Sequence, residues 1–144
     1  DTIPPRSFVK DIKAAVAENH PIGCYRFKFN SSKWILKFNA YMTRFDQLFC
    51  RGGDQTLFVR KDIFEKLGGY KDDFKIMEEY DFIMRARKEF SFKIIPKDVI
   101  VSARKYEGRS WLQVMFANGV VFNMFRWGAS QDAMVKMYRR LLKN

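Results

Sequence analysis

Three carboxylates lie close together in the chain, at Glu78, Glu79 and Asp81. They open an expected helix that runs to about residue 89, on which Glu78 and Asp81 share one face while Glu79 points aside. A carboxylate at the rim of a pocket can take a proton from a hydroxyl nucleophile, and crowding of acids raises the pKa of at least one of them. The same residues have a simpler explanation, because acidic side chains in a first turn complement the helix dipole.

A glycine turn precedes this cluster, in the segment Arg51-Gly52-Gly53-Asp54-Gln55. Glycines permit backbone conformations and close approaches that side chains block. Asp54 and Gln55 supply polar groups that can contact a substrate, although a glycine pair is also common in ordinary tight turns.

The motifs of this region resemble those of family 2 glycosyltransferases, most closely a small bacterial subgroup with a GDQ turn, a Met-Glu-Asp motif and a Ser-x-Arg-Arg motif. The matching segments are Gly53-Asp54-Gln55, Leu67-Gly-Gly-Tyr70, Met77-Glu-Glu79 and Ser102-Ala-Arg-Lys105. Glu79 stands where the family has its catalytic Asp, and Glu78 remains the alternative base. The resemblance covers only the later half of the enzyme, on the acceptor and catalytic-base side.

The resemblance implies a GT-A fold, which is an α/β fold with a mixed sheet flanked by helices, here followed by C-terminal helices. It also implies transfer of a sugar from a nucleotide-sugar donor to an acceptor hydroxyl, with inversion. The implied substrate-binding residues are Gly53, Asp54, Gln55, Asp81, Arg104, Lys105 and Arg109, of which the three basic ones would meet the donor diphosphate or the acceptor. Asp1 would hold a divalent metal, Mg²⁺ or Mn²⁺.

Hydrophobic periodicity predicts the elements that must position these residues. Tyr25, Phe27 and Phe29 alternate with Cys24, Arg26 and Lys28, which predicts a strand with one buried and one partly wet face. Asp81 and Arg85 are spaced to pair along their helix. The expected helices span residues 6–18, 33–46, 61–67, 78–89, 110–127 and 132–143, and the expected strands span 22–29, 55–60, 91–95 and 99–103, with a turn at Pro96-Lys97-Asp98.

We expect a partial GT-A-like domain over residues 1–127 and a basic amphipathic helix over residues 128–144. The stretch from Ser110 to Trp127 is apolar nearly all round, so it is buried or meets another apolar surface, and it is slightly short for a membrane span. The final helix can lie on anionic lipid, cap a core or form a homodimer contact. Peripheral contact with an anionic membrane is therefore left open.

The net charge of +11, from 27 basic and 16 acidic residues, favours an anionic partner. The alternative function is a non-catalytic basic module that binds nucleic acid or an anionic membrane surface; the glycosyltransferase interpretation expects no nucleic acid. Two cysteines, Cys24 and Cys50, make no disulfide framework and favour a reducing compartment. The expected location is the cytoplasm, with contact at the inner face of the membrane left open.

Overall fold

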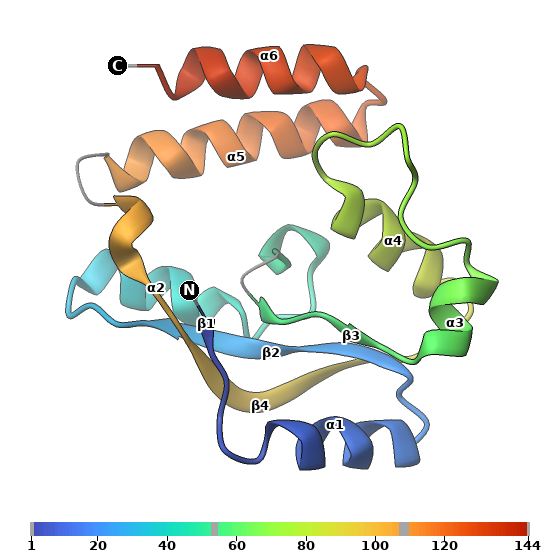
Figure 1. Cartoon of the computed structure of the whole chain (residues 1–144). Coiled ribbons are helices and arrows are strands. Elements are labelled where there is room, and N and C mark those ends of the chain that lie inside the picture. The colour runs from blue at the N-terminus through green and yellow to red at the C-terminus, as the bar shows by residue number, and fades with distance from the viewer. Residues whose placement is uncertain (1, 53–54, 107–109, 144) are drawn as a thin grey trace. The chain divides into compact units, whose positions relative to one another are not determined.

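The computed structural model describes residues 2–52, 55–106 and 110–143, apart from the side chain of Lys105. These residues form an α/β structure with a mixed sheet flanked by helices and with C-terminal helices, as the sequence predicts (Figure 1). The strands are β1 (Thr2–Ile3), β2 (Ile22–Phe29), β3 (Phe58–Val59) and β4 (Phe92–Val101). The helices are α1 (Phe8–Ala17), α2 (Trp34–Met42), α3 (Lys61–Lys66), α4 (Glu78–Ala86), α5 (Trp111–Arg126) and α6 (Gln131–Leu141), with the 3₁₀ helices η1 (Leu48–Cys50) and η3 (Ala103–Tyr106).

The chain divides into two compact units, each made of two chain segments. The first unit comprises Asp1–Gly69 and Glu79–Ala103 and holds the sheet with α1, α2 and α3. The second comprises Tyr70–Glu78 and Arg104–Asn144 and holds α5 and α6. Helices α5 and α6 pack together within the second unit, and the predicted domain boundary after residue 127 stays a prediction.

The sheet has the strand order β1-β4-β2-β3, and β4 runs parallel to β2 while the other pairs are antiparallel. The sequence predicts two strands separated by a turn at Pro96-Lys97-Asp98, and this prediction is wrong. A single strand continues through the proline, because a shift in register between Tyr25 and Arg26 of β2 leaves Pro96 and Lys97 as extra residues of β4. A bulge is one of the few places where a strand accepts a residue without an N–H.

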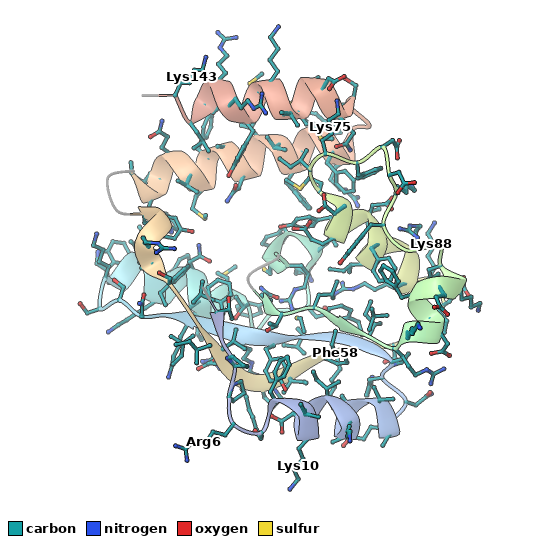
Figure 2. All side chains as sticks on the ribbon, in the orientation of Figure 1. Arg6, Lys10, Phe58, Lys75, Lys88 and Lys143 are labelled. Carbon is teal, nitrogen blue, oxygen red and sulfur yellow. The ribbon has the colours of Figure 1, made fainter. Side chains whose placement is uncertain are left out.

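Strand β2 is covered on both faces over its first half, in place of the predicted single buried face. On one face the ring of Tyr25 stacks on Phe8 of α1, and its hydroxyl donates to the Phe8 carbonyl at 2.9 Å. On the other face Ile22 packs with Phe82 and Ala86 of α4. Lys28, nearer the end of the strand, is exposed. Figure 2 shows the same contrast between the labelled Phe58 in the interior and Lys10 pointing outward from α1.

Local chemistry fixes the ends of several elements. Helix α3 ends as predicted at a left-handed glycine, Gly68, with φ 75°. The predicted strand 55–60 shrinks to β3, since Thr56 has φ 50° and a strand requires negative φ. Position 23 of β2 requires glycine, because a Cβ there would lie 2.2 Å from the carbonyl oxygen of Lys93.

In the second unit, α5 and α6 form a helical hairpin (Figure 1). Buried residues on the two helices include Val114, Ala117, Val121 and Met134. The Ser130 hydroxyl caps α6 by accepting from the Ala133 N–H at 3.3 Å. Over the described part of the chain, no helix combines the length and the apolar character that crossing a membrane requires.

Candidate active site

The segment before the predicted GDQ turn is held by a buried arginine. Arg51 is 2% exposed, and its guanidinium donates to the carbonyls of Thr43 at 2.8 Å and Phe45 at 2.6 Å. The other terminal nitrogen donates to Sγ of Cys24 at 2.9 Å. No carboxylate forms an ion pair with Arg51 within the described residues. The hydrogen bonds from the guanidinium to these two carbonyls and to the sulfur fix the chain between α2 and the turn.

Gln55, a predicted substrate-binding residue, is 2% exposed and makes its hydrogen bonds inside the protein. Its side-chain oxygen accepts from the Cys24 thiol at 3.2 Å, and its side-chain nitrogen donates to the carbonyl of Cys50. Burial raises the pKa of the Cys24 thiol, although the charge of Arg51 opposes this, so the thiol keeps the proton that it donates. This geometry gives Gln55 a supporting role for the loop, and a direct contact with sugar or acceptor hydroxyls stays a prediction.

Two residues next to the predicted motifs adopt a left-handed backbone that non-glycine residues rarely take. Thr56 has φ 50° directly after Gln55, and Met77 has φ 67° directly before Glu78. A β-branched residue in this region is a genuine outlier, and the buried hydroxyl of Thr56 has no hydrogen-bond partner among the residues that the structure describes. Strained residues of this kind cluster at functional sites, where the surrounding fold holds them in place.

The structure brings the flank of the turn and the start of α4 together. The Tyr80 hydroxyl donates to the carbonyl oxygen of Arg51. The Tyr80 hydroxyl also lies near Gly52, because a Cβ at Gly52 would be 3.8 Å from the hydroxyl oxygen of Tyr80. Because Tyr80 directly follows Glu79, this hydrogen bond ties the predicted base to the chain segment that enters the predicted turn.

The predicted pairing of Asp81 with Arg85 is confirmed, with Nε of Arg85 2.8 Å from an Asp81 carboxylate oxygen. The same guanidinium donates to the carbonyl of Leu67 and, at 2.7 Å, to that of Gly69. Arg85 therefore links the glycine turn that follows α3 with helix α4, and the Asp81 carboxylate orients the Arg85 guanidinium. A contact of Asp81 with substrate stays a prediction.

The other predicted acids have different surroundings. Glu78 and Glu79 are both half-buried at the start of α4. Glu79 belongs to the first unit together with Tyr80 and Asp81, whereas Glu78 is the last residue of a segment of the second unit. Among the predicted bases, Glu79 is therefore the one that shares a compact unit with Gln55 and Asp81.

The basic residues and the metal ligand are less fully described. Arg104 is exposed in η3 of the second unit, and Lys105 follows it there without a described side chain. Gly53, Asp54, Arg109 and Asp1 lie outside the described residues. The described side chains include no group of three or more His, Cys, Asp or Glu that could hold a metal ion.

Sequence reasoning missed the supporting residues Arg51, Thr56 and Tyr80. Their roles depend on contacts between segments far apart in the chain, such as the Arg51 bond to Cys24. One signal was available for Tyr80, which lies between two predicted site carboxylates.

Comparisons with models of protein families, with proteins of known function and with solved structures found no match.

Proposed function

We propose that this chain is the acceptor and catalytic-base side of a family 2-like glycosyltransferase that moves a sugar from a nucleotide-sugar donor to an acceptor hydroxyl. The observation that carries the proposal is the hydrogen bond from Tyr80 to the carbonyl of Arg51. It links the acidic cluster to the glycine turn, two of the motifs that hold the predicted site residues. The left-handed residues Thr56 and Met77 beside these motifs add support.

In the proposed reaction Glu79 acts as the general base. Its carboxylate accepts the proton of the acceptor hydroxyl while the hydroxyl oxygen forms a bond to the anomeric carbon of the sugar. The bond between that carbon and the diphosphate oxygen breaks, so the nucleoside diphosphate leaves with the bonding electrons and the sugar is inverted. Glu78 is the alternative base.

Cations stabilise the negative charge that develops on the leaving diphosphate. Arg104, Lys105 and Arg109 are the proposed residues, through charge-assisted hydrogen bonds. Gly53 and Asp54 are proposed to contact the sugar or the acceptor. A divalent cation held partly by Asp1 also stays in the proposal, and no step above depends on it.

The test is an assay of the native polypeptide that contains this chain. Uridine, guanosine and thymidine diphosphate sugars are supplied with Mg²⁺ or Mn²⁺, a deproteinised lysate of the source cells serves as the acceptor mixture, and release of nucleoside diphosphate is measured. Glu79→Gln should lower turnover by about 100-fold or more while donor binding is retained. Glu65→Gln is the matched control, because Glu65 is an exposed acid on α3 that pairs with Lys61.

The outcomes separate the parts of the proposal. Full turnover in Glu79→Gln removes Glu79 from the mechanism, and loss in Glu78→Gln alone assigns the base to Glu78. Absence of turnover with every donor and metal overturns the enzyme proposal. In that case the alternative of a non-catalytic basic module moves ahead.

We also propose that the protein works at an anionic membrane surface. The support from the sequence is the basic helix α6 and the residues just after it, where Lys136, Arg139, Arg140 and Lys143 are exposed. The apolar side of α6 packs on α5, with Met134 fully buried, so this helix offers lipid mainly its charge. Binding of the native polypeptide to anionic but not neutral vesicles is the measurement that tests this location.

A further inference from the structure

Helix α2 and the turns that follow it carry a stripe of exposed aromatic residues. Trp34, Phe38, Tyr41 and Phe45 are 75%, 56%, 54% and 46% exposed. Their spacing of four, three and four residues places them on one side of a helix. Helical turns extend the row past Met42, since the N–H of Phe45 donates to the Met42 carbonyl at 3.1 Å. We call these four residues the aromatic face.

The aromatic face is not the face by which α2 joins its own unit. The opposite side of the helix is buried through Leu36, and Thr43 just beyond the helix is buried as well. Helix α2 contacts β2 on that side. The helix therefore already has a core-facing side, and the exposed rings form a second apolar surface.

Basic residues alternate with the rings. Lys33, Lys37 and Arg44 are all exposed, and each directly precedes an aromatic residue of the face. The guanidinium of Arg44 lies 5.4 Å from the centre of the Tyr41 ring. The sequence from Ser31 to Phe45 contains no acidic residue, and the acid that follows directly, Asp46, forms an ion pair with Arg87. The surface is thus both apolar and positively charged, which requires a partner with both an apolar layer and negative charge.

We infer that the aromatic face and its three cations bind the surface of an anionic phospholipid bilayer. Aromatic rings favour the boundary between headgroups and acyl chains, and Lys and Arg beside them pair with anionic headgroups. This inference assigns a surface to the membrane contact proposed above and does not depend on glycosyl transfer. Unlike α6, whose apolar side is used by α5, the aromatic face offers lipid its rings and its charge together.

Two other occupants fit the same surface less well. In a symmetric dimer through this face, the three cations of one copy would oppose those of the other without an acid between them. A single-stranded nucleic acid usually lies in a basic groove with bases stacked on rings, whereas these rings project from the outside of a helix. Both occupants remain outcomes of the experiment.

The test is co-sedimentation of the full chain with vesicles of phosphatidylcholine alone or with about a third phosphatidylglycerol. Two variants test the rings and the charge separately. Phe38→Ser with Phe45→Ser removes two of the rings, and Lys33→Gln with Lys37→Gln and Arg44→Gln removes the three cations. The matched control, Arg6→Gln with Lys10→Gln and Lys13→Gln on and just before α1, removes the same charge from exposed residues elsewhere. Each cation near an anionic surface contributes roughly 5-fold, so the α2 charge variant should bind about 100-fold more weakly.

We expect the wild-type chain to bind the anionic vesicles, both α2 variants to lose most of this binding, and the α1 control to lose much less. Trp34 fluorescence should shift to the blue on binding, and Trp34→Tyr should remove that shift. The inference is overturned if wild type does not bind, if the α1 control loses as much as the α2 charge variant, or if dimerisation or single-stranded RNA binding is what the α2 variants lose. Unfolding of the serine variant, seen by circular dichroism, would show an internal packing role and would equally overturn it.

Discussion

The hydroxyl of Tyr80 donates to the main-chain carbonyl of Arg51, although the two residues lie on separate segments of the first unit. Arg51 is itself fixed by its side chain to Cys24 of β2 and to two carbonyls after α2. The start of α4 is thereby connected through one carbonyl group to the centre of the sheet. The orientation of Glu79, the neighbour of Tyr80, depends on this connection.

Replacing Tyr80 with Phe tests the connection with the smallest possible change. Loss of one hydrogen bond should lower the free energy of unfolding by about 1 kcal/mol, measured by urea denaturation. If Glu79 is the base, transfer should fall by more than this loss of stability explains. Tyr41→Phe is the matched control, since the Tyr41 ring is exposed, and it should change neither property.

Arg51→Met removes a buried guanidinium and leaves the carbonyls of Thr43 and Phe45 without its hydrogen bonds. Because each buried carbonyl left without a partner costs about 1–3 kcal/mol, we expect the free energy of unfolding to fall by about 3 kcal/mol. Arg51→Lys should recover less than half of this, because an ammonium cannot reproduce the fork that reaches both carbonyls and Cys24. Urea titration followed by circular dichroism measures both effects. Arg139→Met, at an exposed site on α6, should stay within about 0.5 kcal/mol of wild type; an equal loss there would contradict the assignment.

Thr56→Gly should raise stability by about 1 kcal/mol, since glycine takes φ 50° without the steric cost that a β-branched residue bears. It also removes a buried hydroxyl that makes no hydrogen bond to the described part of the chain. If the strain helps to position the turn, donor turnover should fall at the same time. Asn19→Gly is the control, because Asn19 has φ 64° after α1, and its replacement should leave turnover unchanged. A destabilised Thr56→Gly protein would show that the contacts of Thr56 outweigh its strain.

Alkaline pH should weaken the first unit through Tyr25. Burial, with smaller contributions from Asp11, raises the pKa of Tyr25 from 10.0 to about 12. The folded state holds this proton more tightly than the unfolded state, so the stabilisation is complete below pH 10 and is lost as the pH rises towards 12. Urea midpoints of wild type should fall over this range by more than those of Tyr25→Phe. Parallel pH profiles for the two proteins would contradict the shifted pKa.

Periodicity and turn chemistry predicted most of the elements. The amphipathic pattern and Gly68 located α3 and its end, because both signals are local. The helices 33–46 and 78–89 were predicted too long, since hydrogen bonds of the tighter i→i+3 type follow α2 and α4, such as Thr43 N–H to the Ala40 carbonyl. Continuity of β4 through Pro96 was missed, because the bulge that accommodates it is set by pairing with β2. The supporting roles of Gln55 and Arg51 could not be predicted, as burial against Cys24 is a property of the tertiary structure.

The parallel pairing of β2 with β4 has a consequence for how the chain is made. The partner strand for residues 22–29 begins only at residue 92, so on the ribosome β2 emerges well before β4. During that interval β2 exposes unpaired N–H and C=O groups to other nascent chains. Long-range pairing of this kind also slows folding, because a large loop must close before any contact forms. Translation speed between residues 30 and 92 therefore influences how much of the protein aggregates before its central strands meet.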